Sequence, residues 1–397
     1  MARTRVFHSF PSWQLSGVNT WSANLATASR SDPDFEHVML ITGVPAGPVP
    51  ELDAPGIPYV HLPLESPRTK REEWEALKAF LEAAAPCIYI PNYDFHRSCA
   101  VGTLSPQVKV CAVIHSDEDC YYDEVRRVGR YFDAVVTVSS LLQRNLRDKH
   151  PELADRLQWI PHGVPSPGER QNNSSQPGKT LRLFYCNRIS QYQKRVFDLP
   201  EVCRELVRLG VDFTLTVAGS GPDGLELKSR FVRAGLGDKV QQVGRLSGEH
   251  VRKAFLESDV FLLTSDFEGL PISLLEAMSA GCVPVVYDIE SGVRDVVQDG
   301  LNGILTKHGD PRALAEAIRR LDADRSFLAR LSLAALQTHE EKFSVRRMAD
   351  DYRLLFSELM GETRSRVVRD GRVRVPSDLT FRHRLKRRLA RQLSRGY

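Results

Sequence analysis

Short apolar runs alternate with longer stretches of helical pattern along most of this 397-residue chain. Runs such as Ala112-Val113-Ile114 and Val260-Phe261-Leu262-Leu263 are apolar without alternation, which is typical of parallel strands buried on both faces. The pattern predicts strands at Val6–Phe10, Val38–Thr42, Tyr59–Leu62, Cys87–Pro91, Val108–His115, Ala134–Ser139, Leu157–Pro161, Leu181–Tyr185, Phe213–Ala218, Val240–Val243, Val260–Thr264, Val283–Tyr287 and Ile304–Thr306. Because helices separate these strands, the fold class predicted is doubly wound α/β.

The chain is too long for one hydrophobic core, since single cores stop growing at about 250–300 residues. A stretch rich in Pro, Gly, Ser and Asn lies between the two halves and cannot bury a core. We therefore predict two Rossmann-like domains, residues 1–164 and 180–342, that face each other across a cleft and are joined by a linker at 165–179. Ligands of such sheets bind beyond the carboxyl ends of the strands, so functional residues are expected in those loops.

Composition and charge exclude several classes of protein. Hydrophobic residues make up 42% of the chain and charged residues 26%, the balance of a soluble globular protein. No apolar run approaches the roughly 18 residues of a membrane-spanning helix, the N-terminus has no signal-peptide core, and the seven cysteines form no Cys-x-x-Cys pair. We expect a cytoplasmic protein with reduced thiols.

The net charge of +4 comes from the C-terminal end. Residues 361–397 hold twelve Lys and Arg against three acidic residues, a net +9, which leaves −5 for residues 1–360. The body is therefore not a nucleic-acid-binding surface by composition. In residues 377–397 an apolar residue recurs every fourth position among the cations, which predicts a basic amphipathic helix attracted to an anionic membrane surface. A disordered basic tail is the alternative.

The segment Ser265–Gly281 follows a predicted strand and contains the most informative group of candidate binding residues. Pro271 suits the first position of a helix. No side chain at Leu270 can cap that helix, so its N–H groups, with those of Gly269 and Leu270, are open to a ligand phosphate, which the helix dipole also favours. Glu268 before the helix and Glu276 inside it can bracket an extended ligand. A buried helix with a surface Glu and a satisfied interior Glu is the alternative.

This segment resembles the Glu-x7-Glu signature of family 4 glycosyltransferases, which have the two-domain GT-B fold. Further segments resemble the family in the expected order along the chain: Leu15–Thr20, Val113–Asp117, Ile160–Val164, Asn187–Lys194 and Phe343–Tyr352. Three positions depart from the family pattern, since Ser16 precedes Gly17 where a tandem glycine is usual, His162 replaces Asn and Asn187 replaces Gly. The resemblance implies a C-terminal helix at 343–360 that crosses back to the first domain, followed by the basic tail 361–397.

The resemblance also implies a role for each matching residue. The first domain is the acceptor side and the second binds a nucleotide-sugar donor. The residues expected at the donor are Gly17, Arg188 and Lys194 at the diphosphate, Glu268 at a sugar hydroxyl, Glu276 at the ribose, Gly269, Leu270 and Pro271 at the helix start, and Arg245 and Leu246 near the base. His115 ends a buried strand on the acceptor side, where it either meets a hydroxyl or is a satisfied core imidazole.

The chemistry of sugar transfer explains these residue types. Breaking the anomeric C–O bond leaves a dianionic diphosphate, so stabilising that charge is the largest task. Arg188 can clamp phosphate oxygens with its fork, and Lys194 adds a point charge. With two cations and a helix dipole, we expect neither a metal nor a cofactor. The family retains anomeric configuration, which implies same-face attack with a phosphate oxygen deprotonating the acceptor.

Other signals are weaker. Gly219-Ser220-Gly221-Pro222-Asp223-Gly224 matches a dinucleotide-binding fingerprint, but the acid needed about 20 residues later is absent from Val243-Gly244-Arg245. Gly178-Lys179-Thr180 lacks the upstream glycine of a phosphate-binding loop. The acidic run 117–124 either binds a metal or a basic acceptor, or is a solvated loop.

These observations together predict a retaining, metal-independent glycosyltransferase that uses a nucleotide-sugar and a glycan, lipid-linked or small-molecule acceptor. The expected setting is polysaccharide, glycolipid or glycoconjugate synthesis in the cytoplasm, with the protein peripheral to the inner face of the membrane. The alternatives are a nucleotide-sugar epimerase or sugar phosphorylase on the same fold, and a non-catalytic nucleotide-sugar-binding partner.

Overall fold

The structure, a computed structural model, describes residues 3–13, 16–43, 49–64, 69–92, 94–168, 179–361 and 367–371. They divide into two compact units. The first unit contains the residues up to Val138, Leu142–Ile160 and the residues from Ala349 onward. The second contains Ser139–Leu141 and Pro161–Met348. The boundaries thus fall at 160/161 and 348/349, where the sequence suggested 164 and 342, and most of the predicted linker lies outside the described residues.

The first unit is built on a parallel sheet of seven strands in the order β3-β2-β1-β4-β5-β6-β7. Its central strands are almost wholly buried, which explains their unbroken apolar runs, whereas the two edge strands are partly exposed. Their bounds are β1 Thr4–Phe10, β2 Phe35–Ile41, β3 Tyr59–His61, β4 Cys87–Pro91, β5 Val108–Ile114, β6 Ala134–Thr137 and β7 Leu157–Trp159. The order reverses between β1 and β4, so the carboxyl ends of these two strands form the topological switch point of the sheet.

The second unit has a parallel sheet of six strands in the order β10-β9-β8-β11-β12-β13. Their bounds are β8 Leu181–Cys186, β9 Phe213–Ala218, β10 Val240–Gly244, β11 Val260–Leu263, β12 Val283–Tyr287 and β13 Ile304–Thr306. This order also reverses once, between β8 and β11. The predicted doubly wound fold class is therefore confirmed in both units, and each predicted strand is present with ends that differ by up to three residues.

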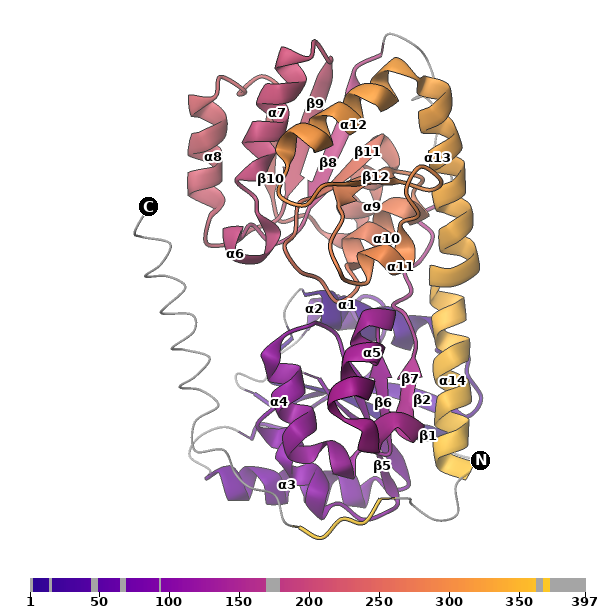
Figure 1. Cartoon of the computed structure of the whole chain (residues 1–397). Helices are drawn as coiled ribbons and strands as arrows, with labels where there is room; N and C mark the ends of the chain where they lie inside the picture. Colours follow the sequence, from indigo (N-terminus) through magenta and orange to yellow (C-terminus); the bar gives the residue numbers. More distant parts are fainter. Residues whose placement is uncertain are drawn as a thin grey trace. The chain divides into compact units, whose positions relative to one another are not determined.

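Helices cover these sheets, as Figure 1 shows for each unit. The α-helices of the first unit are α1 Gly17–Ala28, α2 Pro50–Asp53, α3 Lys70–Ala83, α4 Asp119–Val128 and α5 Ser140–Lys149, the last beginning in the second unit. Those of the second unit are α6 Gln191–Lys194, α7 Asp198–Arg208, α8 Gly224–Arg233, α9 Gly248–Glu257, α10 Ile272–Ser279, α11 Val293–Val296, α12 Pro311–Ala323 and α13 Arg325–Thr338. The long helix α14, Val345–Gly361, comes last. Among the described residues no helix is both long and apolar enough to span a membrane.

Two sequence expectations about helices are wrong in detail. Helix α10 begins at Ile272, and Pro271 is its extended N-cap residue rather than its first helical residue. The acidic run 117–124 is not a solvated loop, because helix α4 begins within it at Asp119. Its Glu124 is buried, and burial raises the pKa of that carboxyl to about 7. Tyr121, Val125 and Val128 on the same helix are buried at helical spacing, and this burial outweighs the polarity of the run.

The first unit is completed by the C-terminal part of the chain. Helix α14 changes unit after Met348, and its Tyr352 and Phe356 pack against Trp21 and Phe35. The segment before it is tied within the second unit to the segment that leaves β7, since Val164 N–H donates to Phe343 O at 3.0 Å and Val345 N–H to Val164 O at 3.3 Å.

Residues 367–371 also dock on the first unit. Arg369 pairs with Asp133 at 2.5 Å, and both side chains are only 4% exposed. Arg369 also donates to Ser105 O at 2.9 Å, and Gly371 N–H donates to Gly102 O at 3.0 Å. A buried ion pair of this kind holds its segment in place, because separating the partners leaves a buried charge. The predicted basic helix at 377–397 lies outside the described residues.

Three polar side chains form a buried chain beneath helix α14. His8 is fully buried and lies 3.1 Å from Ser22 Oγ and, through Nε2, 2.9 Å from His37 Nδ1. Burial lowers the pKa of His37 to about 4, partly opposed by Asp32, and lowers the pKa of His8 well below its usual value. Both imidazoles are therefore neutral in the folded protein at neutral pH.

Because both imidazoles are neutral in the folded protein, we expect the free energy of unfolding to decrease as the pH is lowered. His37 takes up a proton below about pH 6.5 in the unfolded chain, whereas in the folded protein it stays neutral down to about pH 4. The contribution of His37 to the free energy of unfolding is therefore fully present above pH 6.5. It decreases by up to about 3 kcal/mol as the pH falls from 6.5 to 4. His37→Gln is expected to flatten this decrease in urea titrations at pH 7, 6, 5 and 4.5. The exposed His250→Gln is the control, and identical profiles for His37→Gln and the wild type would contradict the assignment.

Candidate functional site

The loop after β11 places several predicted residues at the carboxyl end of the second sheet. Glu268 is buried, as are Gly269, Leu270 and Pro271. Helix α10 follows, and no side chain caps its first turn. This is the open helix start that the sequence predicts, and its dipole favours an anion there.

An ion pair joins the two predicted functional residues of opposite charge. Lys194, the last residue of α6, places Nζ 2.5 Å from Glu268 Oε1. Both side chains are at most 10% exposed. Ser265 Oγ donates to the same carboxylate oxygen at 2.6 Å. The sequence assigned Lys194 to a phosphate and Glu268 to a sugar, and the structure makes them partners of each other.

Backbone hydrogen bonds hold the two loops that carry this pair. Asp266 N–H donates to Gln193 O at 2.8 Å, and the Gln193 amide donates to Phe267 O at 3.1 Å. Thr264 Oγ1 donates to Lys194 O at 2.6 Å. These bonds fix both backbones, so the positions of Lys194 and Glu268 do not depend on their own ion pair alone.

Arg195 turns the chain immediately after Lys194. It is the one described residue other than glycine with a positive φ, 43°. Its guanidinium is held by Asp198 at 2.9 Å and by Asp266 at 3.3 Å. A side chain in this backbone region is strained and persists only where its surroundings fix it, and such strain concentrates at functional sites.

Arg188 lies two residues after β8 and is exposed. Within the described ranges of the chain it forms no ion pair, in contrast to Lys194. Its segment leads to α6, whose first N–H, at Gln191, donates to Asp223 Oδ2 at 2.7 Å. The site thus contains one paired, buried cation and one exposed cation at the end of the central strand β8.

The glycine-rich loop 219–224 supports this segment. Gly219 has φ +133°, and a Cβ there would lie 1.9 Å from Asn187 O. A Cβ at Gly221 would lie 2.1 Å from Ile189 O, whereas one at Gly224 would meet nothing within 4 Å. Ile189 N–H donates to Ser220 O at 3.0 Å. The first two glycines therefore allow the backbone around Arg188 to approach closely, which gives this motif a structural reason that is independent of dinucleotide binding.

Glu276 is half-buried on α10, and burial raises the pKa of its carboxyl to about 7, with Arg252 opposing the change. A carboxyl of this kind can donate or accept a hydrogen bond near neutral pH. Ser273, one turn earlier, donates to Asn187 Oδ1 at 3.2 Å, which connects α10 to the loop of Arg188. Arg245 is exposed and Leu246 half-buried just after β10.

His162 is a neighbour that the sequence noted only as a departure from the family. It is buried, which lowers the pKa of its imidazole to about 3. Its ring hydrogen bonds to the backbone of Leu270 within the second unit. A neutral imidazole therefore supports the loop between Glu268 and α10.

The remaining predicted residues lie in the first unit. His115 follows β5 and is buried, with Nε2 3.1 Å from Asn92 Oδ1 and its ring centroid 4.7 Å from that of Trp21. Gly17 is the exposed first residue of α1, and a Cβ there would meet nothing within 4 Å. Among the described residues no group of three or more His, Cys, Asp or Glu could hold a metal ion.

Comparisons with known proteins show sequence similarity to glycosyltransferases. The family model described as glycosyl transferases group 1 matches residues 168–338. The chain is 34% identical over 170 residues to the amylovoran biosynthesis glycosyltransferase AmsK of Erwinia amylovora, which is 41% of each protein. It is 29% identical over 215 residues to a putative colanic acid biosynthesis glycosyltransferase, WcaL of Salmonella typhimurium, which is 51% of this chain and 52% of the relative. The matches thus span about half the length of these relatives.

The fold matches those of solved structures. A structure of a TarM mutant from S. aureus, in complex with fondaparinux, α-GlcNAc-glycerol and UDP, has a TM-score of 0.77. The match covers 90% of this chain and 100% of that one at 11% sequence identity. This likeness confirms the predicted GT-B fold.

The close contact at Gly221, which Gly224 lacks, predicts that alanine substitutions at these two glycines change the melting temperature by different amounts. Gly221→Ala is expected to lower the melting temperature by about 3–10 °C, because the added Cβ must push back the Ile189 carbonyl at a cost of about 1–3 kcal/mol. Gly224→Ala is the matched control and should change it by about 1 °C or less. Equal melting temperatures for the two variants, measured by differential scanning calorimetry, would show that the loop does not support the Arg188 segment.

Proposed function

Since residues 168–338 belong to the glycosyl transferases group 1 family and the chain has the GT-B fold, we propose that this protein is a retaining, metal-independent glycosyltransferase. It transfers a sugar from a nucleotide-sugar to a hydroxyl acceptor. The observation that carries the proposal is the Lys194–Glu268 ion pair beside the uncapped start of α10, on loops that hydrogen bonds hold together. Both relatives described above are named for exopolysaccharide biosynthesis, which supports a role in polysaccharide or related glycoconjugate assembly.

The donor diphosphate is the ligand of the cations in the second unit. Arg188 is exposed and meets it first, and the N–H groups at the start of α10 add donors aligned with the helix dipole. Lys194 moves part of its interaction from the Glu268 carboxylate to a phosphate oxygen. That exchange releases one carboxylate oxygen of Glu268 to accept a hydrogen bond from a hydroxyl of the donor sugar.

Transfer breaks the bond between the anomeric carbon and a phosphate oxygen and forms a bond from that carbon to the acceptor oxygen on the same face. The acceptor proton goes to the departing phosphate oxygen, so no separate base is required. Negative charge accumulates on the diphosphate in the transition state, and fixed cations and dipoles stabilise it without reorganisation. Arg188, Lys194 and the α10 start supply this stabilisation, which makes a metal ion unnecessary in the proposed mechanism.

The nucleoside binds along the same edge of the sheet. Glu276 accepts hydrogen bonds from the ribose hydroxyls, and its raised pKa, about 7, makes donor binding stronger as the pH rises through neutrality. Arg245 and Leu246 lie near the base at the end of β10, and Gly17 lies near the diphosphate. In the first unit, His115 contacts the acceptor.

Replacement of the charged residues tests the proposal. Arg188→Ala, Lys194→Ala and Glu268→Ala are each expected to reduce turnover about 100-fold or more, because Arg188 and Lys194 stabilise charge that develops in the transition state and Glu268 holds Lys194 and the donor sugar in place. Lys228→Ala, an exposed cation on α8, is the control. EDTA in the same assay should leave the rate unchanged. Full activity in all three variants would contradict the site.

A thermal-shift screen over UDP-, GDP-, ADP- and dTDP-sugars identifies the donor for this assay, because a ligand of the folded state raises the melting temperature. Anomeric NMR of the product then distinguishes transfer with retention from epimerisation or phosphorolysis. Binding of a donor with no turnover would support a non-catalytic partner.

We also propose that residues 377–397 attach the protein to an anionic membrane surface at the inner face of the cell membrane. Deleting them is expected to reduce sedimentation with phosphatidylglycerol liposomes several-fold while donor binding stays the same, because lipid attraction adds up over several cations. Phosphatidylcholine liposomes are the control. Equal sedimentation of the two forms would remove the membrane interaction.

A further inference from the structure

The switch point of the first sheet, between β1 and β4, is where this type of sheet binds ligands. The two strands pair in parallel up to Ser9 and Pro91. Asn92 comes directly after β4, and Asn19 lies in the first turn of α1, the helix that follows β1. Two asparagines thus come from the two segments that follow the strands of the switch point, one from a loop and one from a helix start.

Each of these asparagines has one polar group with a partner and one without. Asn92 is 2% exposed, its Oδ1 lies 3.1 Å from His115 Nε2, and its Nδ2 has no hydrogen-bond partner among the described residues. Asn19 is 4% exposed, its Oδ1 accepts from Ser16 Oγ at 2.5 Å, and within the same described ranges its Nδ2 has no partner either. Buried amides are normally fully hydrogen bonded, so two unsatisfied N–H₂ groups at a binding edge point to a ligand.

The two asparagines belong to one packed region. The imidazole of His115, which Asn92 holds, lies edge-on against Trp21 with 4.7 Å between ring centroids. Trp21 is two residues after Asn19 on α1. The helix that carries Asn19 therefore packs on the side chain that Asn92 orients.

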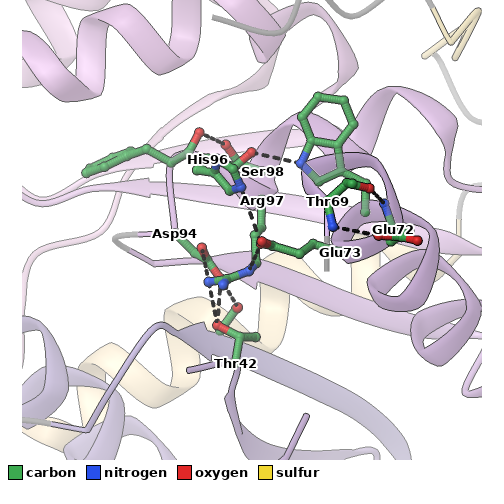
Figure 2. Close-up of polar contacts among 11 residues, drawn as sticks. Thr42, Thr69, Glu72, Glu73, Asp94, His96, Arg97 and Ser98 are labelled. Atoms are coloured by element: carbon green, nitrogen blue, oxygen red, sulfur yellow. Dashed lines mark hydrogen bonds and ion pairs between the residues drawn. The ribbon is translucent and has the colours of Figure 1, made fainter. Parts of the chain in front are cut away.

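The β4 loop is fixed by a buried polar network, shown in Figure 2. Asp94 accepts from Thr42 Oγ1 at 2.9 Å and from Arg97 at 3.1 Å, and it also accepts from Ser9 at 3.2 Å. Arg97 donates in addition to Glu73 at 3.0 Å. These bonds hold the backbone two residues after Asn92, so its amide keeps its orientation.

This network also limits the charge of the ligand that the switch point can bind. Arg97 is 5% exposed and is already paired with two carboxylates, so it is not available to bind an anion. Among the described residues, the switch point offers the side-chain amides of Asn19 and Asn92 and the ring of His115. Such groups can donate hydrogen bonds to the hydroxyl and ring oxygens of a sugar, whereas the side chains of this subsite supply no positive charge to pair with a phosphate or carboxylate.

We propose that Asn19 and Asn92 form a subsite for a neutral, hydroxyl-bearing sugar ring, with their free amide N–H groups donating to its oxygens, and that this ring is the end of the acceptor glycan. The subsite extends the proposed function and rests on it for the identification of the ring as the acceptor. Asn92 also acts as a positioning residue for His115. The ring of the donor sugar has the same chemistry, and the experiment distinguishes the two.

The test uses two isosteric variants of the full-length protein, Asn92→Asp and Asn19→Asp. Each keeps the oxygen that accepts the observed hydrogen bond and replaces the unpartnered N–H₂ group with a second oxygen, so that the donor is lost and a negative charge is added. Asn24→Asp, also on α1, is the matched control. Saturation-transfer NMR measures binding of methyl α-glucoside, α-galactoside and α-mannoside, with glucose 1-phosphate as the anionic comparison.

We expect the wild type and Asn24→Asp to bind at least one neutral glycoside more tightly than glucose 1-phosphate, and each of the two test variants to bind it at least about fivefold more weakly. Unchanged binding in both variants overturns the subsite, since enclosed water then satisfies the two amides. A wild type that binds no neutral glycoside overturns it as well. Melting temperatures check folding, and if Asn92→Asp is unfolded, Asn19→Asp decides alone.

The source of the ring is decided with the donor found in the screen. If the ring is the acceptor, Asn92→Asp raises the acceptor KM and leaves hydrolysis of the donor in the absence of acceptor unchanged. If hydrolysis falls as well, the ring belongs to the donor and the acceptor assignment is wrong. If the wild type turns over no donor but both variants bind the glycoside more weakly than the wild type, the proposed function is contradicted and the subsite is kept.

Discussion

The buried ion pair between Lys194 and Glu268 is the constraint on which the rest of the second unit's site depends. Two buried charges are stable only while they face each other, because separating them in a low-dielectric interior leaves each without compensation. The molecule keeps them together through backbone bonds between their loops and through the αL turn at Arg195. A ligand that binds Lys194 in place of Glu268 must supply a negative charge equivalent to that of the carboxylate. In the proposed function, the donor diphosphate supplies this charge.

Most of the fold could be predicted from the sequence, because buried parallel strands are continuous apolar runs. Few other segments of this chain form such runs. Val260–Leu263 and Cys87–Pro91 needed no tertiary information. The start of α4 was missed because charge along 117–124 was given more weight than the spacing of Tyr121, Val125 and Val128. The exact start of α10 depends on one backbone angle at Pro271, which no pattern encodes.

The candidate site divides in the same way. Arg188, Lys194, Glu268 and Glu276 are predicted site residues because their residue types, order and spacing resemble those of a known family. The supporting residues were not found, and His162 and Asp223 show why. A buried polar residue looks like a surface residue in the sequence until a distant segment covers it. The sequence does show an unusual signal at Gly219 and Gly221, but the dinucleotide-binding interpretation was set aside without another one, and the structure supplies it as close contact with Asn187 and Ile189.

The docking of α14 and of residues 367–371 on the first unit has a consequence for how the protein is made. The surface formed by Trp21, Phe35 and His37 packs against Tyr352 and Phe356, and the carboxylate of Asp133 pairs with Arg369, and these three partners all follow residue 348. A ribosome that has released the first 160 residues has therefore produced a half that is still open, with an apolar face and an acidic group in water. The second unit is contiguous from Pro161 to Met348 apart from three residues, so it can fold first, and the earlier half closes only after α14 and residues 367–371 have been synthesised.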